Sequence, residues 1–146
     1  MALTRSEQAT HCFSQGFNCT QVVLGVFCQH LGFNKDTAMK LTTGFGSGMK
    51  CGEMCGAVTG ALMVISLKYG HGMDKDADAK EKTNKMVLEF QKRFVNENGS
   101  VICKEILGYD LSKSEELETI KEQNLFKSVC PKMVASAVNI LEDLIL

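Results

Sequence analysis

Apolar residues in the first third of this chain recur every three to four positions, the spacing that places side chains on one face of a helix. Capping residues precede these apolar stretches. Thr4 and Glu7 have the spacing of a capping box, while Asn18 and Asn34 are N-cap residues for the next two. We therefore predict three short helices, each ending at or before a glycine: Gly16, Gly32 and Gly44.

The stretch from Cys51 to Tyr69 is apolar on nearly every side. Its apolar residues lie along one helical stripe and on a second flank beside it: Cys55, Ala57, Val58, Ala61, Leu62, Val64, Ile65 and Tyr69. A helix that is apolar all round belongs in the interior of a domain. We predict that this helix forms the centre of the fold and ends at Gly70.

The second half of the chain predicts four more helices. A long charged helix runs from Asp74 to about Asn98, and a short one lies between Ser100 and Gly108. Two further helices cover residues 114–122 and about 129–145. A single proline and abundant Ala, Leu, Met, Lys and Glu favour helix throughout. Residues 1–146 are therefore predicted to be all-α, a compact single-domain bundle of six or seven helices around the central apolar helix.

Charge and hydropathy exclude several classes of partner. Lys and Arg total 16 against 17 Asp and Glu, so a net charge of −1 gives no general attraction to nucleic acid or to an anionic membrane. No apolar run reaches the ~18 residues that a membrane span needs. The N-terminus has no basic segment followed by an apolar core, so we expect no export signal and a cytoplasmic protein.

Seven cysteines, an odd number, argue against a secreted disulfide framework and for buried, metal-binding or redox-active thiols. Cys51 and Cys55 lie in a glycine-rich stretch, residues 44–60, that holds six of the 13 glycines. In one regular helix their Cβ atoms would be roughly 5–6 Å apart, too far for a direct disulfide. Cys51 is predicted at or just before the helix start, where unpaired amides stabilise a thiolate and make it the better nucleophile candidate.

Cysteines at two other predicted helix starts complete a candidate site. Cys103 follows the Gly99-Ser100 cap, and Cys130 directly precedes the only proline, Pro131. Cys12, Cys19 and Cys28 are interpreted as packing residues, with a fifth-thiol role as the second interpretation for Cys19 because it also begins a capped helix. The three histidines show no ligand spacing.

The ordered cysteines resemble those of a known family. The matching features are the motif Cys55-Gly56-Ala57-Val58-Thr59-Gly60, Cys51 before it, Cys103 ahead of Ile106-Leu107-Gly108, Cys130, and the segment from Asn18 to Leu24. Together they resemble the C_GCAxxG_C_C family of redox-active proteins, which has four characteristic cysteines. The resemblance implies redox activity through cysteine and covers nearly the whole chain.

Two functions follow from this set of residues. In thiol/disulfide exchange, Cys51 is the attacking thiolate, Cys55 its neighbour, and Cys103 or Cys130 the resolving thiol. In the alternative, the same four thiolates hold an iron–sulfur cluster, zinc or another soft metal, with Gly52, Gly56 and Gly60 allowing close approach. A third interpretation is a structural domain in which the cysteines only pack. A redox partner and a homodimer are further expectations.

Overall fold

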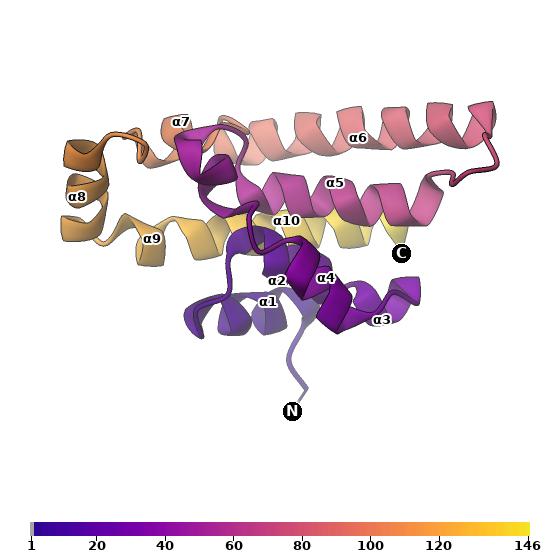
Figure 1. Ribbon diagram of the computed structural model, residues 1–146, viewed down its shortest axis with the longest axis horizontal. Helices are drawn as coiled ribbons and strands as arrows, with labels where there is room; N and C mark the ends of the chain where they lie inside the picture. The colour runs from indigo at the N-terminus through magenta and orange to yellow at the C-terminus, as the bar shows by residue number, and fades with distance from the viewer. Residues whose placement is uncertain (1) are drawn as a thin grey trace.

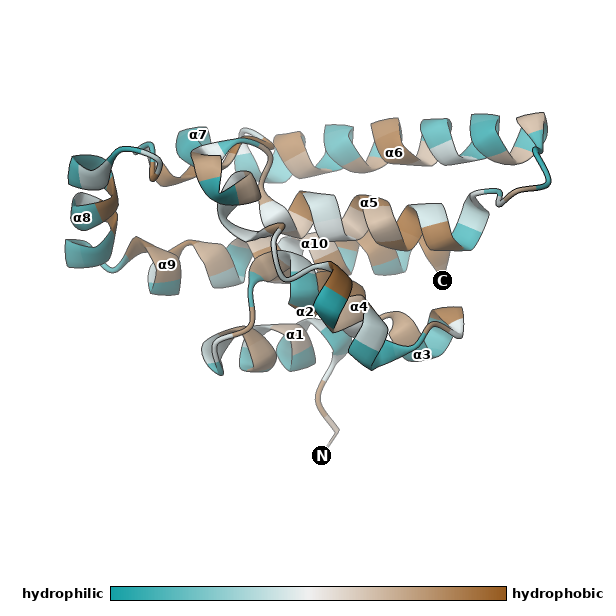
Figure 2. Ribbon diagram, viewed as in Figure 1, coloured by the Kyte–Doolittle hydropathy of each residue, from teal (hydrophilic) through white to brown (hydrophobic). Residues whose placement is uncertain are grey.

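Three helices run along the long axis of the molecule in the computed structural model, which describes residues 2–146 (Figure 1). They are α5 (Gly56–Tyr69), α6 (Ala77–Asn98) and α10 (Cys130–Ile145), and each packs against the other two. The central helix α5 is the predicted apolar one, and much of it is coloured as hydrophobic in Figure 2. Its fully buried residues are Ala57, Val58, Ala61, Val64 and Ile65.

Four short helices pack beside these three: α1 (Arg5–Ser14), α2 (Cys19–Gly25), α3 (Cys28–Leu31) and α4 (Lys35–Leu41). Helices α2 and α3 contact α5, α1 contacts α10 and α2, and α4 contacts α2 and α3. Helix α2 packs closely on α5 because Gly60 has no side chain: a Cβ there would lie only 2.9 Å from the Thr20 carbonyl oxygen. The predicted capping box is present at Thr4 with Glu7, and the predicted N-cap residue Asn18 forms a second capping box with Gln21.

The other end of the molecule is built from α7 (Cys103–Leu107), α8 (Ser114–Glu122) and α9 (Leu125–Ser128) (Figure 1). Their apolar side chains form a second, smaller core in which Leu107, Leu111 and Ile120 are buried. Cys103 and Cys130 belong to this core, so the junction between the two cores is also where cysteines gather. The all-α prediction is confirmed, with ten α-helices in residues 2–146 and one isolated β-bridge.

Several predicted boundaries are wrong. The first helix stops at Ser14 instead of Gly16, and the helix predicted from Asn18 to Gly32 breaks at Val26 and Phe27 into α2 and α3. The third ends at Leu41. The short helix α9 was not predicted. No helix among residues 2–146 is both long enough and apolar enough to cross a membrane.

The most consequential correction concerns the start of the central helix. It was predicted from Cys51, but α5 begins at Gly56, and Cys51 belongs to a separate π-turn, η1 (Gly48–Gly52). The two are kept apart by backbone in the left-handed region: Met49 and Lys50 have φ of 61° and 62°. Such values are uncommon for residues with side chains and cannot continue an α-helix. The helical spacing of Cys51 and Cys55 therefore does not apply.

Candidate functional site

Four helix starts, each carrying a cysteine, meet at one small cavity. Cys19, Cys103 and Cys130 are the first residues of α2, α7 and α10, and Cys55 is the N-cap of α5. All four line a cavity of about 60 Å³. The rest of its wall is mostly apolar and comes from the same elements and from α1 and α9: Phe13, Asn18, Ser47, Gly56, Ile106, Leu107, Phe126 and Met133.

A short antiparallel pairing brings Cys55 and Cys103 together. Met54 and Ile102 form an isolated antiparallel bridge. On either side of it, the Cys55 amide donates to the Val101 carbonyl at 2.7 Å and the Cys103 amide donates to the Glu53 carbonyl at 2.6 Å. Both cysteines are therefore fixed at the backbone, although they are far apart in sequence. Both are buried, with 7% and 8% of their surface exposed.

The start of α2 is tied to the start of α5 by Thr20. This fully buried residue places its Oγ1 2.9 Å from the Phe45 carbonyl oxygen and 3.0 Å from that of Gly56. Gly56 allows this approach, because a Cβ at that position would overlap the Cys19 Sγ and lie 2.7 Å from Thr20 Oγ1. The glycine of the cysteine-glycine-alanine motif thus makes room for a cysteine of another helix.

Cys130 is placed by the junction between α9 and α10. Pro131 lies in the first turn of α10, where its missing amide leaves no intrahelical bond unmade. Cys130 packs with the smaller core and is half-buried, as is Cys19. The four cysteines thus come from four helices that are far apart in the sequence.

Burial raises the pKa of every thiol in this cavity, and repulsion from neighbouring thiolates raises those of Cys55, Cys103 and Cys130 further. Loss of solvent raises the pKa of Cys55 to about 12, and the nearby Cys19 adds to the effect. The pKa of Cys103 is also raised to about 12, by burial and then by Cys19 and Asp110. Cys130 has its pKa raised by burial and by the charges of the other three. Each thiol is therefore close enough to others in the group for their charges to matter.

Backbone amides partly offset this effect at two of the sulfurs. Burial raises the pKa of Cys19, whereas hydrogen bonding from the amides of Ser47, Thr20 and Gly56 lowers it. The amides of Ala57 and Val58, at the start of α5, act in the same direction on the pKa of Cys55. Apart from that of Ser47, these amides lie in the first turns of α2 and α5, where the helix dipole favours negative charge.

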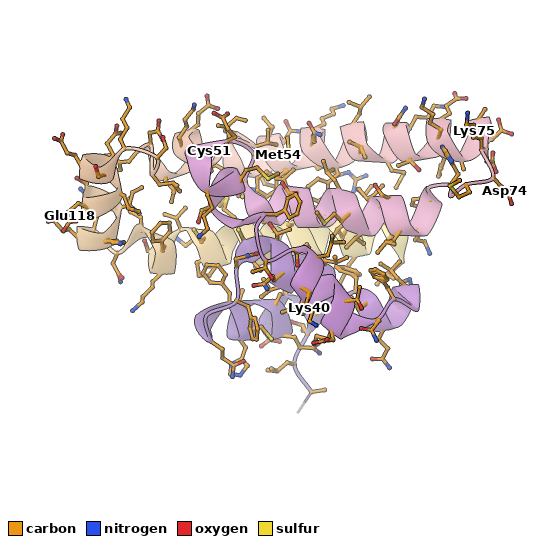
Figure 3. The ribbon with its side chains drawn as sticks, viewed as in Figure 1. Lys40, Cys51, Met54, Asp74, Lys75 and Glu118 are labelled. Carbon is orange, nitrogen blue, oxygen red and sulfur yellow. The ribbon has the colours of Figure 1, made fainter. Side chains whose placement is uncertain are left out.

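Cys51 lies outside the cavity. It is exposed on η1, beside α7 (Figure 3), and its Sγ donates to the Gly48 carbonyl at 3.3 Å. Of the predicted four, the structure brings together Cys55, Cys103 and Cys130, and it adds Cys19 in place of Cys51.

Of the three predicted glycines, only Gly56 lines the cavity. Gly60 lies against α2, and Gly52 has a left-handed φ of 73° and faces Lys104 and Asp110. Cys28 is buried and its thiol donates to the Leu24 carbonyl, while Cys12 packs against the main core. Both agree with the packing interpretation.

The chemistry of the cavity suits a soft cation. Four thiols are the donor set of iron–sulfur clusters and of many structural zinc sites. Among residues 2–146, however, no three His, Cys, Asp or Glu side chains are already arranged to hold a metal ion.

Comparison with known proteins identifies a family. A family model with the description "Putative redox-active protein (C_GCAxxG_C_C)" matches residues 17–144. No curated protein matches the chain, and no solved structure does. The matched range contains Cys19, Cys55, Cys103 and Cys130 and begins two residues before the first of them.

Proposed function

Because this chain belongs to the C_GCAxxG_C_C family of redox-active proteins, we propose that the four-thiol cavity is its redox centre. In this proposal the thiolates of Cys19, Cys55, Cys103 and Cys130 hold an iron–sulfur cluster, which accepts and donates single electrons. The observation that carries the proposal is the meeting of four cysteines from four helix starts at one small, mostly apolar cavity.

The raised pKa values favour ligation over attack by a free thiolate. A thiol whose pKa is about 12, such as Cys55 or Cys103, is ionised in only about one molecule in 10⁵ at pH 7. Exchange with a disulfide needs the thiolate, so these residues are poor nucleophiles toward a disulfide substrate in the metal-free protein. Metal ligation removes this obstacle, because a coordinated thiol is deprotonated.

The amides around the cavity suit sulfur ligands as well. Those of Ser47, Thr20 and Gly56 favour a negative charge on the Cys19 sulfur, and those of Ala57 and Val58 do the same for Cys55. Hydrogen bonds to ligand sulfurs are one of the means by which a protein sets the reduction potential of a cluster. The apolar wall, which includes Phe13 and Phe126, limits the access of water.

Anaerobic purification or reconstitution tests the proposal through iron and sulfide analysis and a visible spectrum. We expect stoichiometric iron in the wild type and in Cys51→Ser, and a loss of most iron in Cys19→Ser. Cys51→Ser is the matched control, because Cys51 is exposed outside the cavity. Iron lost from Cys51→Ser but retained by Cys19→Ser would overturn the assignment of the four ligands. Bound zinc without iron would overturn electron transfer by a cluster.

A second candidate function is thiol/disulfide exchange within the cavity. It is favoured by the free state of all seven cysteines, which leaves the cavity thiols available to one another. Two of them would give up two electrons and two protons to a disulfide substrate. Counting alkylated thiols after incubation with oxidised glutathione separates the two functions: loss of two cavity thiols in the metal-free wild type, reversed by a dithiol, would favour exchange.

A further inference from the structure

Cys51 and Cys103 both lie close to Gly48. The exposed Cys51 donates its thiol hydrogen to the Gly48 carbonyl at 3.3 Å. Cys103 lies against the α-carbon of that same glycine, because a Cβ on Gly48 would be only 2.8 Å from the Cys103 Cβ. An exposed thiol therefore has a buried cavity thiol as its neighbour.

We propose that Cys51 is an oxidation site for hydroperoxides and that its oxidised form captures Cys103 in a disulfide. The consequence rests on the proposed function: the disulfide withdraws one of the four ligands, so the oxidised metal-free chain no longer accepts a cluster. The contacts of Gly48 with both side chains, together with the exposure of Cys51, carry this inference.

The chemistry balances in two steps. The Cys51 sulfur attacks one peroxide oxygen, the O–O bond breaks, and the products are a sulfenic acid and one water, or an alcohol from an organic hydroperoxide. The Cys103 sulfur then attacks the Cys51 sulfur; the S–S bond forms, the S–O bond breaks, and the leaving hydroxide takes the thiol proton as water. Two thiols lose two electrons in total, and the peroxide gains them.

Cys55 is a less suitable partner for Cys103. The bridge between Met54 and Ile102 places Cys55 diagonally opposite Cys103. Diagonal positions in an antiparallel pair have Cα atoms roughly 7–8 Å apart, beyond the ~6.8 Å limit for a disulfide. Two backbone hydrogen bonds hold the turn that contains Cys51. The Glu53 amide donates to the Gly48 carbonyl, and the Cys103 amide donates to the Glu53 carbonyl. The neighbours of Cys51, Met49 and Lys50, have left-handed backbone, a strained conformation for residues with side chains.

Peptide mapping of the metal-free protein tests the inference. After one equivalent of hydrogen peroxide, we expect two of the seven thiols to become resistant to alkylation and a Cys51–Cys103 link to appear in a non-reducing digest. Cys51→Ser should retain its remaining thiols, and the matched control Cys12→Ser should still form the link. A Cys103 disulfide to any other cysteine, or an equal loss of thiols in Cys51→Ser, would overturn the inference.

Reconstitution with iron and sulfide then tests the consequence. Peroxide-treated wild type should bind at least tenfold less iron than untreated protein, whereas treated Cys51→Ser should bind as much as untreated. Equal losses in both proteins would refute the switch. The mapping needs no metal, so a mapped Cys51–Cys103 link in a protein that never binds iron would leave the oxidation site standing and remove the proposed cluster.

Discussion

Alkaline pH should destabilise the reduced, metal-free protein, and Cys55 allows the size of this effect to be measured. Burial raises the pKa of Cys55 from 9.0 to about 12. The folded state therefore holds the thiol proton more tightly than the unfolded state does. By linkage, this contribution to the free energy of unfolding is fully present below pH 9 and is lost as the pH rises from 9 toward 12.

The expected magnitude follows from the two pKa values. Between pH 8 and pH 10 the unfolded thiol ionises while the folded one stays protonated, so Cys55 alone lowers the free energy of unfolding by about 1.4 kcal/mol. The wild type should lose more than this, because Cys19, Cys103 and Cys130 also have raised pKa values. The limit of pH 10 keeps most lysines charged.

Urea unfolding followed by circular dichroism, in the presence of a reductant and a chelator, measures the effect. Cys55→Ser removes the titrating group, so its loss of stability from pH 8 to pH 10 should be smaller than that of the wild type by about 1.4 kcal/mol. Serine is the better N-cap for α5, but that gain is the same at both pH values and cancels. Identical pH dependence in the two proteins would refute the burial argument.

Two further substitutions test the joint between α2 and α5. Gly56→Ala should lower the free energy of unfolding by about 1–3 kcal/mol and reduce bound iron, because the added Cβ would overlap the Cys19 Sγ. Urea unfolding measures the change against Gly72→Ala, a control at a glycine with open space around it, and unchanged stability would contradict the packing. Thr20→Val should lower the free energy of unfolding by about 1–3 kcal/mol, because it removes the hydroxyl that donates to the Phe45 and Gly56 carbonyls. Thermal unfolding of this variant is compared with that of the exposed control Thr37→Val, and equal melting temperatures would contradict the prediction.

Local signals in the sequence predicted most of the helices. The caps at Thr4, Asn18 and Asn34 all form, and Gly32 and Gly99 end helices in the left-handed conformation. These features depend on a few adjacent residues, which is why a single sequence reveals them. The break at Val26 and Phe27 has no such signal, because both residues are apolar and continue the helical pattern.

The candidate site was only partly predictable for the same reason. Helix starts with cysteine could be found by inspection, and Asn18 marked Cys19 as one of them. The sequence favoured Cys51, because it lies in the glycine-rich stretch at the predicted start of the central helix. The choice between Cys19 and Cys51 depends on the left-handed backbone of η1 and on the packing of α2 at Gly56. The spacing of apolar residues along the sequence does not reveal tertiary contacts of this kind.

The distribution of the four cysteines over α2, α5, α7 and α10 has a consequence for biosynthesis. Cys130 begins α10, so a nascent chain shorter than 130 residues has at most three of the four thiols. Nascent chains fold from the N-terminus as they emerge. The cavity is therefore completed only when α10 has been synthesised and docks against the N-terminal helices and α6, so a cofactor of the proposed centre would bind after that step.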